Sequence, residues 1–290
     1  MKRLRVSVIG LGHAGTAVLN ECIEASSVDV IGAWNRGPVS PPPRGLGDRL
    51  AVGGPTPPSR IQDVDLLLLA VSDRAVPEVA AGLSVSGDTA VVHLSGAADV
   101  SLLDSLATGE PGCWHPLQAF AAGSSYDAKS PPYAVALQGS PLAVSRGRQL
   151  AEALGHPAVE LAADGRAAYH AAAVLASNCL VSLEAVAVRV MGRAGVPPVD
   201  AWKLLWPLVR GTLSNLEGGP SPSALTGPIA RGDADTVRRN LAALTDDPGG
   251  ADVYRSLGTE AVTLARARGV APAILTEISA LLACPPPNDD

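Results

Sequence analysis

The amino-acid sequence predicts an α/β protein, in which a doubly wound parallel sheet with helices on both faces is followed by an all-α C-terminal domain. Three observations support this. Short apolar, strand-like runs alternate with helical segments in the first half of the chain, and residues 66–71 form an unbroken apolar run, typical of a parallel strand covered on both faces. Beyond residue 164, long Ala/Leu/Val-rich segments with helical spacing take over. We therefore expect two domains, 1–163 and 164–290.

The elements follow from the periodicity of the apolar residues. Strands are predicted at 4–9, 28–34, 66–71 and 90–94, with shorter candidates at 113–114, 133–137 and 158–161. Helices are predicted at 14–25, 75–83, 166–194, 199–216, 233–244, 251–268 and 272–283. The proline-rich segment 37–58 is expected to be a surface loop, and 285–290 a frayed tail.

Composition excludes several classes of protein. The 22 Lys and Arg residues against 28 Asp and Glu residues give a net charge of −6, which argues against nucleic-acid or anionic-membrane partners. Hydrophobic residues make up 47% and aromatic residues 3%, so we expect cores of Ala, Leu and Val. The four cysteines form no C-x-x-C pair, and neither a metal site nor a disulfide framework is predicted. A strand close to Met1 leaves no room for a signal peptide, so we expect a cytoplasmic protein.

One stretch, 167–188, imitates a membrane span between Arg166 and Arg189. It carries several side chains that hydrocarbon tolerates poorly: Tyr169, His170, Ser177, Asn178, Ser182 and Glu184. We therefore expect a helix buried in protein, with no membrane partner.

The segment Gly10-Leu11-Gly12-His13-Ala14-Gly15 fits G-x-G-x-x-G, directly after a strand and at the start of a helix. In such a loop Gly10 permits the tight turn, Gly12 lets the backbone approach a pyrophosphate, and Gly15 lets the helix pack on the strand. Free N–H groups from Leu11 to Ala14, with the helix dipole behind them, would form an anion site. The pattern predicts a dinucleotide-binding Rossmann domain; a merely structural turn is the alternative.

The end of the second strand indicates which cofactor binds. NAD-specific enzymes place Asp or Glu there for the ribose 2′-hydroxyl, whereas this strand ends Trp34-Asn35-Arg36. Asn35 and the guanidinium of Arg36 favour NADP over NAD, unless Arg36 is a solvated loop charge. After the strand that begins at residue 66, Val71, Ser72 and Asp73 lie where the cofactor should cross the sheet edge, although Asp73 is equally suited to cap the next helix.

Two histidines follow neighbouring strands. His93-Leu94-Ser95-Gly96 and Trp114-His115-Pro116-Leu117-Gln118 both lie at the carboxyl edge, where ligands of open α/β sheets bind. Pro116 fixes the exit of the chain, so His115 is the leading acid–base candidate, with Ser95 orienting the substrate. The alternative is that each histidine is neutral and bonds the backbone.

In the long helix, His170, Ser177 and Asn178 would share one face. Either this stripe meets protein groups or it faces a ligand, with Asn178 holding a substrate oxygen and His170 acting as acid or base. In the second case we expect the His115 and Asn178 side chains within about 10 Å of each other in one cleft.

The turn Leu225-Thr226-Gly227-Pro228 is expected to form a shaped loop near that cleft. Asp233 fits a helix N-cap, and Arg231 could bind a carboxylate.

Together these motifs resemble a bacterial Rossmann-like family whose C-terminal domain is catalogued as a domain of unknown function (2520). The family is related to the 6-phosphogluconate dehydrogenase-like group, which includes ketopantoate and pyrroline-5-carboxylate reductases, and its His115-Pro116-Leu117 is similar to the His-Pro-Met of prephenate dehydrogenases. The resemblance implies a nicotinamide cofactor and a helical domain that forms a homodimer. Many relatives carry a catalytic Lys one turn before an Asn on the long helix. Asn178 matches that Asn, but Val174 stands at the Lys position, so an acid–base role would pass to His115 or His170.

The sequence therefore predicts an NADP-dependent oxidoreductase that transfers a hydride between nicotinamide and a small carboxylate-bearing carbonyl, imine or alcohol. The first alternative is a non-catalytic protein that binds or senses NADP(H) or another nucleotide. The second is a structural dimer whose glycine loop is a relic.

Overall fold

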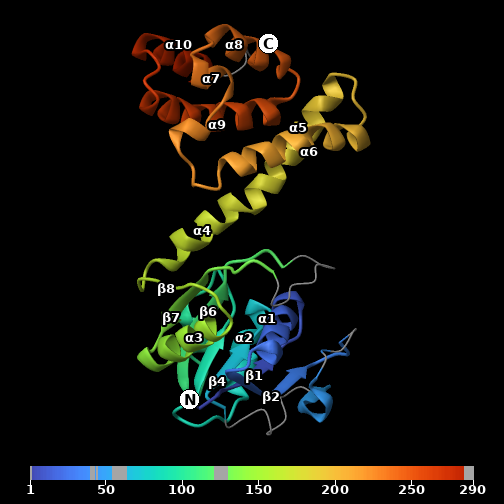
Figure 1. Cartoon of the computed structure of the whole chain (residues 1–290), viewed down its shortest axis with the longest axis vertical. Helices are drawn as coiled ribbons and strands as arrows, with labels where there is room; N and C mark the ends of the chain where they lie inside the picture. Colours follow the sequence, from blue (N-terminus) through green and yellow to red (C-terminus); the bar gives the residue numbers. More distant parts are fainter. Residues whose placement is uncertain (1, 40–42, 44, 54–63, 121–129, 284–290) are drawn as a thin grey trace. The chain divides into compact units, whose positions relative to one another are not determined.

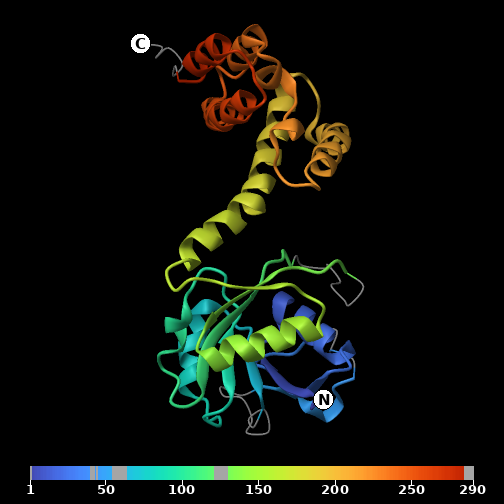
Figure 2. The same cartoon turned by 60° about the vertical axis from the view of Figure 1, so that its left-hand side comes forward.

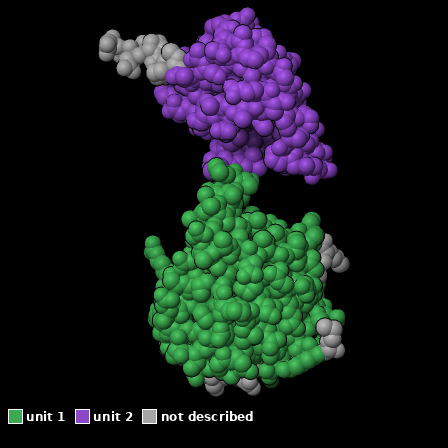
Figure 3. Space-filling view, turned by 90° about the vertical axis from the view of Figure 1, so that its left-hand side faces the viewer, with its two compact units in different colours: residues 1–177 green, residues 178–290 purple. Residues whose placement is uncertain are grey.

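The computed structural model describes residues 2–39, 43, 45–53, 64–120 and 130–283. The chain divides into two compact units, Met1–Ser177 and Asn178–Asp290 (Figure 3). The domain boundary expected after residue 163 stays a prediction. The tail expected at 285–290 lies outside the described residues.

Unit 1 is built on an eight-stranded sheet with the order β3-β2-β1-β4-β5-β6-β7-β8 (Figure 1). All neighbouring strands run parallel except β6 and β7, which pair antiparallel. The strands are β1 (Leu4–Ile9), β2 (Val28–Asn35), β3 (Leu50–Val52), β4 (Leu66–Leu69), β5 (Ala90–His93), β6 (Glu110–Pro116), β7 (Val135–Gly139) and β8 (Ala158–Glu160). The order of the first six strands is that of a dinucleotide-binding Rossmann sheet, which confirms the predicted fold class.

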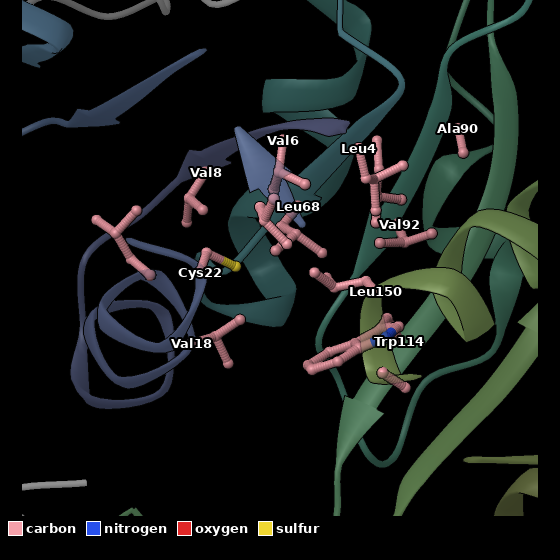
Figure 4. Close-up of a cluster of buried hydrophobic side chains, with 14 of the residues drawn as sticks. Leu4, Val6, Val8, Val18, Cys22, Leu68, Ala90, Val92, Trp114 and Leu150 are labelled. Atoms are coloured by element: carbon pink, nitrogen blue, oxygen red, sulfur yellow. The ribbon is translucent and has the colours of Figure 1, made fainter. Parts of the chain in front are cut away.

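Helices α1 (His13–Glu24) and α3 (Pro141–Ala153) cover one face of this sheet, and α2 (Val76–Ala81) covers the other. Helix α4 (Arg166–Ala176) follows β8 near the end of the unit. The unit also contains the 3-10 turns η1 (Gly47–Arg49), η3 (Asp73–Ala75) and η4 (Val100–Leu103). The strand β4 shows why an unbroken apolar run suits this position. Leu66 and Leu68 pack with residues of α1 and α3, whereas Leu67 and Leu69 pack with residues of α2 on the other face. Figure 4 shows part of the first cluster, and Figure 2 shows α3 lying across that face.

A buried polar cluster joins α1 to the far edge of the sheet. Glu21 is 4% exposed, and its carboxylate accepts hydrogen bonds from the Tyr133 hydroxyl (2.7 Å) and from His156 Nε2 (3.0 Å). His156 Nδ1 accepts from the Tyr133 amide at 3.4 Å, and the two rings stack. Both oxygens of the buried carboxylate therefore have donors, as a buried charge requires.

The structure corrects three sequence predictions. Segment 37–58, expected to be a loop, contains β3, which pairs with the end of β2. Helix α3 was not predicted, although Ser140 caps it and Pro141 occupies its first turn. The helix predicted over 166–194 is two helices, because the backbone at Ser177 leaves the helical region (φ −122°, ψ −76°).

Unit 2 is all-helical, as predicted. It contains α5 (Asn178–Arg193), α6 (Pro198–Asn215), η5 (Pro222–Ala224), α7 (Gly227–Arg231), α8 (Ala234–Ala243), α9 (Pro248–Ala267) and α10 (Pro272–Ala283). Its core lies among α7 to α10 and includes Ile229, Val237, Val262, Leu275 and Ile278. By contrast, no residue of α5 is buried. The expectation that the apolar segment is buried in protein is therefore wrong within a single chain.

By length and composition, residues 166–193 are also able to cross a membrane. Their most apolar window has a mean hydropathy of 1.8, and none of it is buried.

Candidate functional site

The three glycines of the loop differ in how closely other atoms surround them. Gly10 has φ +94°, and a Cβ added there would lie 2.6 Å from the carbonyl oxygen of Ala70. A Cβ on Gly15 would lie 2.1 Å from the carbonyl oxygen of Gly10. Gly12 has no atom within 4 Å of its Cβ position. Gly10 and Gly15 are thus required by the protein's own packing, whereas Gly12 faces open space at the start of α1.

The loop is held by Asn35 at the end of β2. The Asn35 side chain accepts a hydrogen bond from the Leu11 amide (2.9 Å) and donates one to the carbonyl of Gly37 (2.8 Å). The Leu11 amide, expected to be free for a phosphate, is therefore engaged by the protein. Helix α1 begins at His13 without a side-chain cap, so the amides of its first turn, including Ala14, are the ones left for an anion.

The other predicted cofactor residues flank this loop. Arg36 is exposed just after β2, and Val71 and Ser72 follow β4, with Ser72 exposed. The side chain of Ser72 makes no cap bond to η3. Asp73 does not cap either, because its carboxylate accepts a hydrogen bond from Ser95 Oγ at 2.8 Å. The Asp73–Ser95 contact ties the end of β4 to the end of β5.

His93 and Ser95 are bound into the protein. His93 Nδ1 accepts from the Ser95 amide (3.2 Å), so Nε2 carries the proton and donates to the Asp99 carbonyl (2.9 Å). Burial lowers the pKa of His93 from its ordinary value. The Ser95 hydroxyl donates to Asp73 and accepts from the Ala98 amide at 3.0 Å. For His93 the structural alternative holds, and the role of Ser95 toward a substrate stays a prediction.

His115 lies differently, with one nitrogen bonded and one open. Its Nδ1 is 2.6 Å from the hydroxyl of Tyr169 on α4. The ring covers Gly96, where an added Cβ would lie 2.6 Å from Nε2. Burial first, and then the charge of Arg166, lowers the pKa of His115 to about 4. His115 is therefore a neutral imidazole near pH 7 and cannot act there as an imidazolium acid.

Sequence analysis missed Tyr169 and Arg166 as site residues. Arg166 is 3% exposed, and its Nε and Nη2 both lie 3.3 Å from Gln138 Oε1. Its guanidinium carbon lies 5.7 Å from the centre of the Tyr169 ring. Burial raises the pKa of Tyr169 to about 12, although Arg166 lowers it. The signal that could have identified the site is the charge of Arg166 at the start of an apolar helix. We interpreted that charge only as the boundary of the apolar segment.

The expected stripe does not lie on one continuous helix. His170 lies on α4, and its Nδ1 is buried without a hydrogen-bond partner among the described residues. Ser177 ends α4, and Asn178 begins α5 in unit 2. The break at Ser177 removes the argument that the three share a face. The roles of His170 and Asn178, and the expected proximity of His115 to Asn178, stay predictions.

The turn at 225–228 lies within unit 2. Leu225, Thr226 and Pro228 line an apolar cavity of about 590 Å³ between α5, α6, α7 and α9. Asp233 caps α8, as predicted, by accepting from the Thr236 amide at 3.0 Å. Within the described residues no group of three His, Cys, Asp or Glu side chains could hold a metal ion.

Comparison with known proteins agrees with the sequence motifs. Residues 133–261 match the family model described as a domain of unknown function, DUF2520, which confirms the predicted resemblance for this segment. No curated protein sequence matches the chain.

Solved structures share the fold. A Thermotoga maritima protein has a TM-score of 0.70 at 20% identity, over 91% of this chain and 100% of that one. An Aspergillus terreus reductive aminase, solved with NADPH and ethyl levulinate, has a TM-score of 0.55 at 16% identity, over 97% and 93%. Plasmodium falciparum pyrroline carboxylate reductase, solved with NADP bound, has a TM-score of 0.55 at 11% identity, over 98% and 100%.

We predict that His115 makes stability depend on pH. Below its ordinary pKa of about 6.5, the unfolded chain binds a proton at His115, but the folded protein does not until about pH 4. The free energy of unfolding should therefore fall as the pH is lowered through this window. Urea unfolding should show a weaker decline in His115→Gln. An NMR titration that places the His115 pKa at its ordinary value would contradict the prediction.

Proposed function

We propose that the chain is an NADP-dependent oxidoreductase, which transfers a hydride between nicotinamide and a small carboxylate-bearing carbonyl, imine or alcohol. The observation that carries this proposal is the glycine loop. Two of its glycines are needed by the protein itself, but Gly12 leaves the backbone open where α1 begins. An open glycine at an uncapped helix N-terminus is what a dinucleotide pyrophosphate requires.

The surrounding residues fit this cofactor. Asn35 ends β2 and Arg36 follows it, with no carboxylate at either position, and Val71 and Ser72 follow β4 beside the loop. Relatives in fold include enzymes solved with NADP or NADPH bound. The bound cofactor would supply the hydride, while His115 would hold the substrate oxygen or nitrogen as a neutral hydrogen-bond donor. A cytoplasmic location remains part of this proposal.

One observation favours the non-catalytic alternative, a protein that binds or senses NADP(H). His115 is neutral near pH 7, and Val174 rather than a lysine stands on α4. An enzyme of this kind would have to draw its proton from another group. Turnover is therefore the measurement that separates the two functions.

Hydride transfer should be detectable as loss of NADPH absorbance with a panel of 2-oxo acids and cyclic imino acids, or as its gain from NADP with 2-hydroxy acids. The test variant is Gly12→Ala. It should fold normally, because its Cβ meets no protein atom. It should lose cofactor binding and turnover together, because the added methyl group would occupy the space that the pyrophosphate needs. NADPH binding without transfer on any panel member would favour the sensor. If the protein binds no nucleotide, the result would favour a structural dimer whose glycine loop is a relic.

We predict that NADPH binds at least about tenfold more tightly than NADH, which corresponds to roughly 1.4 kcal/mol. Arg36 is exposed and able to pair with a 2′-phosphate, and no carboxylate replaces it. Arg36→Ala should remove most of the difference in calorimetric titrations, whereas Arg266→Ala on the exposed end of α9 should not. Equal affinities in the wild-type protein would count against NADP.

We propose that a second copy of the chain covers the apolar helices. Val181 on α5 and Val199, Leu204 and Leu208 on α6 are each more than 60% exposed. Large apolar side chains this exposed on two packed helices mark an interaction site. A membrane is the weaker partner, because Arg166 and Tyr169 attach the start of α4 to the α/β unit.

The protein should therefore be a dimer at micromolar concentration in light scattering. Leu204 and Leu208 lie one turn apart on α6, so the double substitution Leu204→Glu and Leu208→Glu places two charges in the contact and should give monomers. Thr259→Glu, on the exposed side of α9, should leave the dimer intact. A wild-type monomer, or a wild-type protein soluble only in detergent, would rule out this assembly.

A further inference from the structure

Arg166 is a buried cation without an anion. Its side chain bonds the neutral oxygen of Gln138, and its Nη1 is buried with no hydrogen-bond partner among the described residues. No Asp or Glu of the described chain lies within ion-pair distance of it. A buried charge in this state is costly unless something compensates for it. Within the described residues Arg166 therefore has no ion-pair partner, and it also interacts with the Cys113 thiol and, at longer range, with Asp99.

The guanidinium faces Tyr169, one turn further along α4. The two residues are three positions apart, so both side chains leave the first turn on the same side of the helix. The Arg166 guanidinium carbon is 5.7 Å from the centre of the Tyr169 ring. A negative charge formed on the Tyr169 oxygen would be the anion that Arg166 lacks.

The Tyr169 hydroxyl is hydrogen-bonded to one nitrogen of His115, and the other nitrogen of the ring makes no hydrogen bond within the described residues. It lies 2.6 Å from His115 Nδ1, and the two rings meet edge to face. Nε2, on the other side of the imidazole, has no hydrogen-bond partner among the described residues. It lies over Gly96, where a Cβ would approach it to 2.6 Å. A side chain at position 96 would collide with Nε2, so glycine there keeps this nitrogen free of side-chain contact.

We propose that Tyr169, His115 and Arg166 form a proton relay, in which His115 donates the proton that accompanies hydride transfer, Tyr169 replaces it, and Arg166 stabilises the resulting tyrosinate. The proposal rests on the oxidoreductase function proposed above. His115 would touch the substrate and Tyr169 would supply its proton, whereas Arg166 is a positioning residue.

The step balances in the direction of reduction. The bound cofactor supplies a hydride to the carbonyl or imine carbon. The substrate oxygen or nitrogen takes the proton from His115 Nε2, and Nδ1 takes the proton from the Tyr169 hydroxyl. His115 is neutral before and after the step, and the negative charge rests on Tyr169 beside Arg166. Water then protonates Nε2 while Nδ1 returns its proton to the tyrosinate, which restores the starting tautomer and leaves hydroxide in the solvent.

The pKa directions agree with this arrangement. Burial and Arg166 hold the pKa of His115 at about 4, so the imidazole passes a proton on rather than storing one. Burial raises the pKa of Tyr169 while Arg166 lowers it. The hydroxyl therefore stays protonated at neutral pH and transfers its proton only when His115 Nε2 has donated to the substrate.

The first test uses the protein without cofactor. Nitrogen NMR of labelled histidine should find His115 as the Nε2–H tautomer at neutral pH, because Nδ1 accepts from Tyr169. Arg166→Met should raise the His115 pKa, and Arg166→Lys should restore the low value. A Nδ1–H tautomer, or a His115 pKa unaffected by Arg166→Met, would overturn the relay whether or not the protein is an enzyme.

The second test uses whichever panel substrate turns over. Tyr169→Phe keeps the ring that faces Arg166 but loses the hydroxyl, and should slow single-turnover hydride transfer about 100-fold or more. Its NADPH affinity should stay within error of the wild type, and its melting temperature should fall only as far as the loss of one hydrogen bond requires. Arg166→Lys should recover most of the rate lost in Arg166→Met. An unchanged rate in Tyr169→Phe would overturn the relay alone, whereas no hydride transfer by the wild type would overturn the proposed function and the relay with it.

Discussion

The close approach of α1 to the ends of β1 and β4 controls the geometry of the N-terminal unit. A Cβ on Gly15 would lie 2.1 Å from the carbonyl oxygen of Gly10, and a Cβ on Gly10 would lie 2.6 Å from that of Ala70. This contact fixes where α1 begins and points its first amides beyond the carboxyl edge of the sheet. Asn35 then closes the loop from β2 by taking up the Leu11 amide. What remains open is the backbone at Gly12, so the packing of the protein itself leaves space for a ligand.

The polar residues along the same edge differ mainly in whether the protein satisfies them. His93 uses both ring nitrogens and Ser95 both donates and accepts, so these side chains hold β4, β5 and η4 together. His115, on the neighbouring strand, uses one nitrogen and leaves the other over Gly96. Arg166 shows the same contrast among charges, since Glu21 has two donors and Arg166 has no anion. The candidate site therefore combines a histidine with one unbonded nitrogen and a buried arginine without an ion pair, beside residues whose polar groups are bonded.

Local patterns account for what the sequence predicted correctly. The glycine loop and the run Leu66–Leu69 are each a few consecutive residues whose spacing fixes their role. Strand β3 has three residues in a proline-rich segment, and it is a strand because β2 offers it hydrogen bonds. The break at Ser177 has neither proline nor glycine to announce it. Tyr169 meets His115 across 54 positions of sequence, a contact that no periodicity reveals. The fold could thus be predicted largely from the sequence, but the arrangement of the site could not.

The arrangement of Arg166 and Tyr169 explains why position 174 can be a valine. A lysine on the long helix, as in the enzymes that the sequence resembles, both carries a proton and presents a positive charge. Here the two properties are separated within one turn of α4, because Tyr169 carries a proton and Arg166 carries a positive charge. Burial first and then Arg166 lower the pKa of His115, and Arg166 also lies beside the tyrosine ring, so one buried cation acts on both members of the hydrogen-bonded pair. With this pair on the preceding turn, position 174 needs no ionisable group and can be apolar.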